Sequence, residues 1–170
     1  MGVGGLLHRT LSENIMLSTL RKNAFFLKMM LNTYAPYVGA GVRVTHLDLD
    51  GGLIDVEMPL TRFNKNYVGT QFGGSLYSMV DPFYMLILIN RLGPDYVVWD
   101  KAASIDFKSP GRGRVHARIQ ITLDDVDQIR QLAAEGGAVL QSYTVRILAD
   151  DDHVVAEVQK TLYIRKKKQR

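Results

Sequence analysis

The segment from Gly73 to Leu92 is apolar on nearly every side of a helix. Its apolar side chains are Leu76, Tyr77, Met79, Val80 and the unbroken run from Phe83 to Ile89. A helix of this kind is surrounded by other structure and does not lie on a surface. The segment therefore predicts a buried helix that the rest of the domain must cover, and Gly93-Pro94 predicts its end.

Strand patterns surround this helix in the sequence. Alternating apolar residues bounded by turn signals predict strands over residues 42–47, 53–58, 96–107, 115–121, 139–147 and 154–164. Helical spacing predicts a leading helix over 10–32 and a short helix over 124–135. The pattern favours an α+β fold in which a curved antiparallel sheet wraps around one central apolar helix, with an extra N-terminal helix.

Length and composition indicate one domain. The chain has 170 residues, of which 46% are hydrophobic, so it can bury a core. We expect an N-terminal helix and lead-in over 1–39, the main domain over 40–164 and a basic tail over 165–170. The last six residues carry five positive charges, and without them 16 basic residues face 17 acidic ones. Such a tail suits a solvated end better than a nucleic-acid site, so no nucleic-acid partner is expected.

Several chemical classes are excluded by composition. The chain has no cysteine, so disulfides and thiolate chemistry are absent, which fits a reducing compartment. The four histidines are isolated, and no metal site is expected. No signal peptide and no apolar run of about 18 residues is evident, so we expect a cytoplasmic protein without a membrane span.

Residues 66–81 carry the chemistry. They contain the side-chain amide of Asn66, the pair Gly73-Gly74 opening the apolar segment, and Asp81 seven residues past Gly74. An amide and a free backbone N–H can polarise a carbonyl, and a carboxylate in an apolar wall can activate water. These are the parts that an acyl-transfer hydrolase needs.

The spacing within this segment carries a further inference. Asp81 lies about 10 Å along a helix from the glycine pair, at ~1.5 Å per residue. A carboxylate that far along cannot attack a carbonyl held at the first N–H of its own helix. If both groups serve one substrate, they come from two chains, and the sequence favours a homodimer with two composite sites.

Two motifs resemble a known family. Asn66, Gly69, Gly73, Gly74 and Asp81, together with the stretch Ile105-Asp106-Phe107-Lys108-Ser109-Pro110, resemble the PaaI-type hotdog acyl-CoA thioesterases. The resemblance covers about residues 40–164. The leading helix and the excursion at 124–137 suggest a divergent branch. Phe72 stands where most relatives carry a histidine.

The resemblance implies a role for each matching residue. Asp81 would be the general base or nucleophile, the Gly73 N–H would polarise the thioester carbonyl, and Asn66 would orient substrate or water. Asp100 stands near the position at which related enzymes carry a small polar residue that assists water. The substrate-binding set would also include Gly74, Ser109, Arg112 and Arg114, with the two arginines on the phosphates of coenzyme A. The family implies no cofactor beyond the coenzyme A of the substrate, and dimers that often pair into tetramers.

Structural explanations compete with these roles. Asp81-Pro82 also fits the start of a helix, with Gly73–Val80 extended, and in a continuous helix Pro82 should produce a kink. Asn66 also fits a loop cap, Asp100-Lys101 a surface salt bridge, and the two arginines a solvated turn. At the level of function, a non-catalytic hotdog dimer that binds acyl-CoA or a lipid is the main alternative. A dehydratase or hydratase on the same fold is a third, although no histidine lies in the helix.

Overall fold

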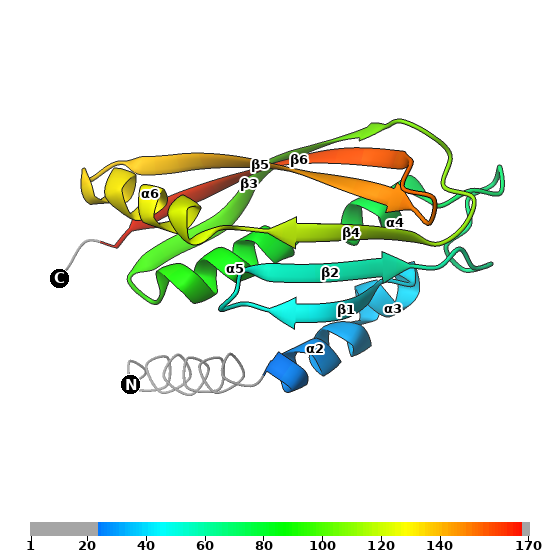
Figure 1. Ribbon diagram of the computed structural model, residues 1–170, viewed down its shortest axis with the longest axis horizontal. Helices are drawn as coiled ribbons and strands as arrows, with labels where there is room; N and C mark the ends of the chain where they lie inside the picture. The colour runs from blue at the N-terminus through cyan, green and yellow to red at the C-terminus, as the bar shows by residue number, and fades with distance from the viewer. Residues whose placement is uncertain (1–23, 168–170) are drawn as a thin grey trace, which may run out of the picture.

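A six-stranded antiparallel sheet forms the body of the protein in the computed structural model, which describes residues 24–167 (Figure 1). The strand order is β1-β2-β4-β5-β6-β3, and every neighbouring pair is antiparallel. The strands are β1 (Arg43–Asp48), β2 (Leu53–Met58), β3 (Tyr96–Phe107), β4 (Val115–Gln120), β5 (Ala138–Ala149) and β6 (Val154–Lys166). The α+β class and the six predicted strands are confirmed.

Five helices accompany the sheet within the described residues. They are α2 (Ala24–Thr33), α3 (Ala35–Ala40), α4 (Gly73–Ser78), α5 (Phe83–Leu92) and α6 (Leu123–Ala134). The start of α6 is fixed by a capping box between Thr122 and Asp125, in which each side chain bonds the backbone N–H of the other. None of these helices is both long and apolar enough to cross a membrane.

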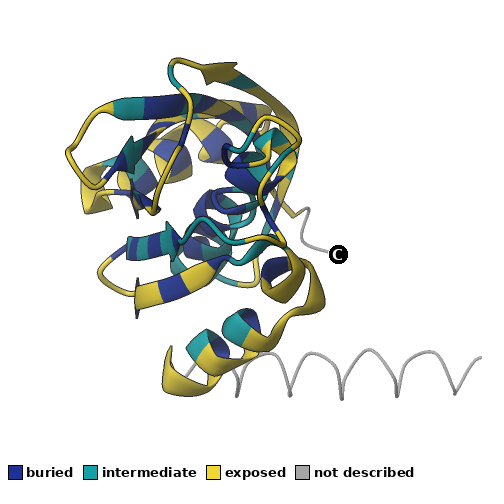
Figure 2. Cartoon of the chain, turned by 90° about the vertical axis from the view of Figure 1, so that its right-hand side faces the viewer, coloured by how far each residue is buried: buried dark blue, intermediate teal, exposed yellow. Residues whose placement is uncertain are grey.

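The core lies between α5 and the sheet. Phe83, Ile87 and Leu88 of α5 have no exposed surface, and the alternating inner residues of β2, β4 and β6 are equally buried. Figure 2 shows these buried positions on the helices and strands that face one another. Burial of apolar surface on this scale is the main force that holds such a domain together.

The apolar segment forms two helices where one long helix was expected. Between α4 and α5 the backbone makes tight turns, with Val80 N–H donating to Tyr77 and Asp81 N–H donating to Ser78. Pro82 has no N–H and therefore cannot continue the ladder of helical hydrogen bonds. The alternative with an extended Gly73–Val80 is not observed either, since α4 occupies most of that range.

The lead-in to the sheet is helical. Of the predicted helix over 10–32, residues 10–23 lie outside the described residues, and α2 accounts for the rest. The side-chain amide of Asn32 exchanges two hydrogen bonds with the backbone of Val44, which ties α2 to β1. Residues 35–40 form the short helix α3, because Pro36 fits the first turn of a helix. Residues 168–170 of the basic tail lie outside the described residues, while β6 runs through Lys166.

Candidate active site

A buried lysine stands at the centre of the candidate site. Lys160 lies on β6 at a position where the alternation places Val158 and Leu162 on the inner face of the sheet. Its side chain has no exposed surface. A charged group is almost never fully buried unless it is paired, so its partners define the chemistry of this region.

Two carboxylates and a phenol surround the Lys160 ammonium. Its Nζ lies 2.6 Å from Asp81 Oδ1 and 3.2 Å from Asp100 Oδ1. It also donates to the Tyr77 hydroxyl at 3.1 Å, and that hydroxyl donates to Asp81 Oδ1 at 2.6 Å. These residues come from α4, from the break after it, from β3 and from β6, so the cluster joins the helices to the sheet.

The two oxygens of Asp81 are in different situations. Both the Lys160 ammonium and the Tyr77 hydroxyl bind Oδ1. Within residues 24–167 nothing donates a hydrogen bond to Oδ2, and the side chain is 45% exposed. The carboxylate is thus anchored through one oxygen and presents the other.

The electrostatics follow from burial and pairing. Burial raises the pKa of Asp100 above its ordinary value, and the nearby Lys160 ammonium only partly offsets this. Burial acts to lower the pKa of Lys160, but the hydrogen bonds to Asp81 and Tyr77 outweigh it and raise that pKa. Lys160 is therefore charged at neutral pH, and the three ionised groups leave the cluster one negative charge when both carboxyls are ionised.

A second phenol reaches toward the cluster from α3. The Tyr37 hydroxyl is buried and has no hydrogen-bond partner among the described residues. Burial raises the pKa of this hydroxyl, and the negative charge of Asp81 raises it further.

A cavity of about 500 Å³ lies beside α4, with Gly73 and Leu76 of that helix in its lining. Four of the predicted site residues line it, namely Asn66, Gly73, Ser109 and Arg112. Neither Asp81 nor Asp100 is among its lining residues. Within the chain, four of the predicted site residues therefore lie at the cavity and two, Asp81 and Asp100, lie at Lys160, while Gly74 and Arg114 belong to neither group.

Gly73 is the first residue of α4 and borders the cavity. It follows Phe72, whose side chain makes no cap for the helix. The Gly73 N–H donates to no backbone or side-chain acceptor within residues 24–167, as is usual for the first N–H groups of a helix. A Cβ at Gly73 would lie 2.9 Å from the Phe107 ring, and one at Gly74 would lie 2.5 Å from the Phe72 ring. Both glycines therefore permit close packing of an aromatic ring.

The Asn66 side chain is used by its own loop. Its oxygen accepts from the N–H groups of Val68 and Thr70, and its amide nitrogen donates to the Thr70 hydroxyl and the Gln71 carbonyl. All of its hydrogen-bonding capacity is taken, which matches the loop-cap explanation. The contact with substrate that the resemblance implies stays a prediction.

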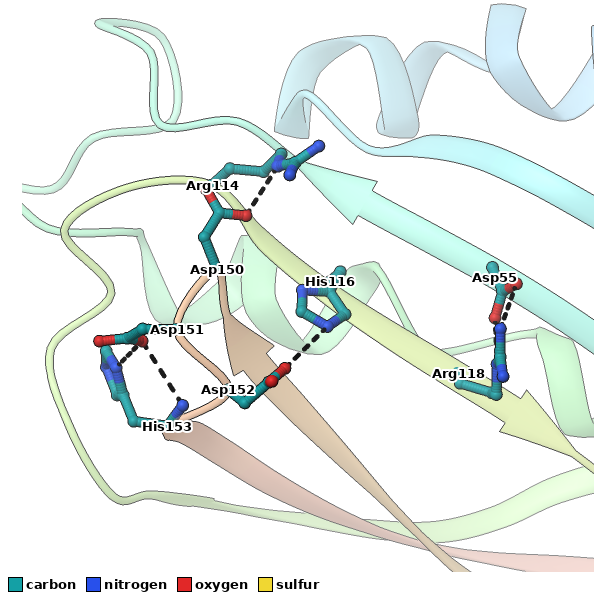
Figure 3. A network of polar contacts seen from close by, with 8 residues as sticks. All are labelled: Asp55, Arg114, His116, Arg118, Asp150, Asp151, Asp152 and His153. Atoms are coloured by element: carbon teal, nitrogen blue, oxygen red, sulfur yellow. Dashed lines mark hydrogen bonds and ion pairs between the residues drawn. The ribbon is translucent and has the colours of Figure 1, made fainter.

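The turn residues divide between cavity and surface. Arg112 makes no ion pair with the described residues, whereas Arg114 lies 2.8 Å from Asp150 (Figure 3) and also 3.2 Å from Glu57. Figure 3 shows the Arg114–Asp150 pair among other polar contacts, where β4 begins and β5 ends, and the side chains of both residues are exposed. The Ser109 hydroxyl donates to the Val154 carbonyl and so fixes the turn.

Sequence reasoning missed Lys160. It treated this residue as an ordinary member of the last strand. Lys160 shares the alternating buried positions of Val158, Leu162 and Ile164, and a lysine in such a position indicates a buried charge that needs a partner. The salt bridge considered for Asp100 with Lys101 is also different in the structure, because Asp100 pairs with Lys160. No three His, Cys, Asp or Glu side chains between residues 24 and 167 form a group suited to a metal ion.

Comparison with protein families gives a clear match. The family described as domain of unknown function DUF4442 matches residues 22–164. The chain belongs to this family. No curated protein matches the chain.

Solved structures resemble this DUF4442 chain in fold. A probable thioesterase of Pseudomonas aeruginosa is 19% identical, with a TM-score of 0.71, over 82% of this chain and 93% of that one. A thioesterase of Haemophilus influenzae is 16% identical, with a TM-score of 0.63, over 86% and 93%. The Escherichia coli PaaI protein from the phenylacetic acid degradation operon is 18% identical, with a TM-score of 0.54, over 79% and 87%. At these identities the likeness supports the hotdog expectation at the level of fold.

Proposed function

We propose that this protein hydrolyses the thioester of an acyl-CoA. The observation that carries the proposal is the Asp81 carboxylate, which is anchored through Oδ1 beside a buried ammonium and leaves Oδ2 open. The neighbouring Lys160 and Asp100 both have raised pKa values, and groups with shifted pKa values cluster at functional sites. Names of several proteins that share the fold include the word thioesterase, which supports the same reaction class.

In the proposed reaction Asp81 acts as a general base. Water gives one proton to Asp81 Oδ2 while its oxygen bonds to the thioester carbonyl carbon. The C–S bond then breaks, and the proton passes to the sulfur, so that a carboxylic acid and free coenzyme A leave. Direct attack by the same carboxylate, followed by hydrolysis of the resulting anhydride, gives the same products. The Gly73 N–H stabilises the negative charge that develops on the carbonyl oxygen.

The substrate is proposed to lie along the cavity beside α4. The unpaired Arg112 guanidinium at its rim suits a phosphate group of coenzyme A, and the apolar side chains of Leu76 and Phe107 suit the less polar part of the substrate. Arg114 is already paired with two carboxylates, so we assign it a smaller part in phosphate binding.

A homodimer completes the proposed site. The cavity and Asp81 are separate within one protomer, so Asp81 of one chain would serve the cavity of the other. Strand β3 offers a surface for this pairing, since it lies at the edge of the sheet and is exposed over residues 101–104. An unpaired edge strand is a ready template for a second strand. Pairing of two such dimers into a tetramer belongs to the same proposal.

The test is thiol release from a panel of acyl-CoAs by the wild type and by Asp81→Ala. We expect turnover by the wild type and a loss of at least ~100-fold in the variant, the usual worth of a general base. Asp106→Ala is the matched control, because Asp106 lies on β3 with its side chain exposed and its one ion pair among residues 24–167 is with Lys108. Both variants must have the same oligomeric mass in solution and the same secondary-structure content as the wild type.

A non-catalytic acyl-CoA or lipid carrier is the second candidate. The observation in its favour is the ion pair that already engages Asp81, which gives that carboxylate a structural use without any reaction. Saturable binding of acyl-CoA without turnover, unchanged in Asp81→Ala, would establish this candidate and remove the thioesterase.

A further inference from the structure

Lys160 has no explanation in packing. Its neighbours on the inner face of β6 are apolar and fully buried, so an apolar side chain would fill position 160 without the cost of burying a charge. Buried ion pairs often contribute nothing to stability when compared with apolar residues of similar size. The reason for a lysine must therefore lie in what its ammonium does to its partners.

We propose that Lys160 is a positioning residue for the reaction, which holds Asp81 by Oδ1 so that Oδ2 faces the nucleophilic water. This inference rests on the proposed function and adds to it a residue that neither motif contains. The Lys160 Nζ lies 2.6 Å from Oδ1, and the Tyr77 hydroxyl binds the same oxygen at the same distance. Two donors on one oxygen fix the rotation of the carboxylate and leave a single acceptor free.

Asp100 fits this role as the balancing partner. Its Oδ1 faces the ammonium at 3.2 Å and has no hydrogen-bond partner among the described residues. Lys160 is thereby held between β3 and the break after α4, and cannot swing away without leaving two carboxylates unpaired. The groups that face the ammonium are Asp81, Tyr77 and Asp100.

The experiment compares Lys160→Met in two backgrounds. In the wild type, the substitution leaves two carboxylates facing each other without a cation, which threatens folding. In Asp100→Asn, the same substitution leaves Asp81 as the sole charge of the cluster, so the paired variants Asp100→Asn and Asp100→Asn/Lys160→Met separate the role of Lys160 from the effect of charge repulsion. Lys166→Met, on an exposed position of β6, is the control for loss of a lysine.

We expect the double variant to lose about 10–100-fold in kcat relative to Asp100→Asn, the usual effect of losing a group that orients a reacting residue. KM should stay within about threefold, because Lys160 does not line the cavity. The acidic limb of the pH–rate profile should move to higher pH, because the remaining carboxylate loses the cation that favours its charged form. Asp100→Asn/Lys160→Arg, which keeps the cation, should have a kcat between those of Asp100→Asn and Asp100→Asn/Lys160→Met.

The outcomes are distinguishable. Equal kcat and an unmoved pH profile in Asp100→Asn and Asp100→Asn/Lys160→Met would overturn the role of Lys160 while the thioesterase stands. Lack of turnover by the wild type on the whole acyl-CoA panel would overturn the proposed function itself, and the positioning role with it.

Discussion

At the scale of single residues, two properties of Gly73 matter for the proposed reaction. Its missing side chain admits the Phe107 ring, which would lie 2.9 Å from a Cβ, and its N–H is the first of α4. The preceding Phe72 is extended, with φ −69° and ψ 129°. That backbone also accepts a proline at position 73, since proline is favoured at the first helical residue and requires an extended residue before it.

Two substitutions at Gly73 therefore distinguish the effect of losing the N–H from the effect of filling the space beside Phe107. Gly73→Ala and Gly73→Pro both bring a Cβ toward Phe107, but only the proline lacks the N–H. If that N–H stabilises the developing oxyanion, Gly73→Pro should lose a further factor of about 10²–10³ in kcat relative to Gly73→Ala. Steady-state kinetics on the best acyl-CoA decide the matter, and circular dichroism checks that α4 persists. Equal rates in the two variants would assign Gly73 to packing alone.

Asp100 carries a prediction about stability. Burial raises its pKa in the folded protein, so the folded state binds the proton more tightly than the unfolded chain does. The wild type therefore loses stability as the pH rises through this pKa, and Asp100→Asn does not. We expect Asp100→Asn to be more stable than the wild type at pH 7, and the difference in stability to shrink as the pH falls.

Urea unfolding at several pH values measures this difference. Asp106→Asn on the same strand is the control, because its side chain is 67% exposed and should show no comparable gain. A wild type that is more stable than Asp100→Asn at pH 7 would mean that the attraction between Asp100 and Lys160 outweighs the cost of burial.

At the scale of elements, the strands could be predicted because apolar and polar residues alternate along them in the sequence. Val115, Ala117 and Ile119 of β4 alternate with polar residues, and all three are buried in the sheet. A period of two specifies both the element and its buried face. The capping box at Thr122 similarly makes the start of α6 readable from a few neighbouring residues.

The break between α4 and α5 was harder to predict because two local rules compete there. Apolar side chains continue through Asp81-Pro82, which favours one helix, while the proline interrupts the hydrogen bonds of that helix. The Asp81 carboxylate at this break binds Lys160, which lies 79 residues further along the chain. No local pattern reports such a contact, so the centre of the site became visible only in the structure.

At the scale of the whole molecule, the separation of the cavity from Asp81 has a consequence for assembly. In one protomer Gly73 borders the cavity and Asp81 does not, so a single chain supplies only part of the proposed site. Residues 101–104 of the edge strand β3 are exposed and free for a second copy of the chain. The proposed enzyme should therefore be active only as a dimer, with one residue of each pair contributed by each chain.

Mixing two inactive variants tests this composite site. Asp81→Asn and Gly73→Pro homodimers each damage both of their sites, but a mixed dimer has one site with an intact Asp81 and an intact Gly73. If the two variants are unfolded together in equal amounts and refolded, half of the dimers should be mixed, and about a quarter of the wild-type activity should return. Each variant refolded alone is the control. If the mixture is no more active than the sum of its parts, Asp81 and Gly73 serve the same substrate from one chain or not at all.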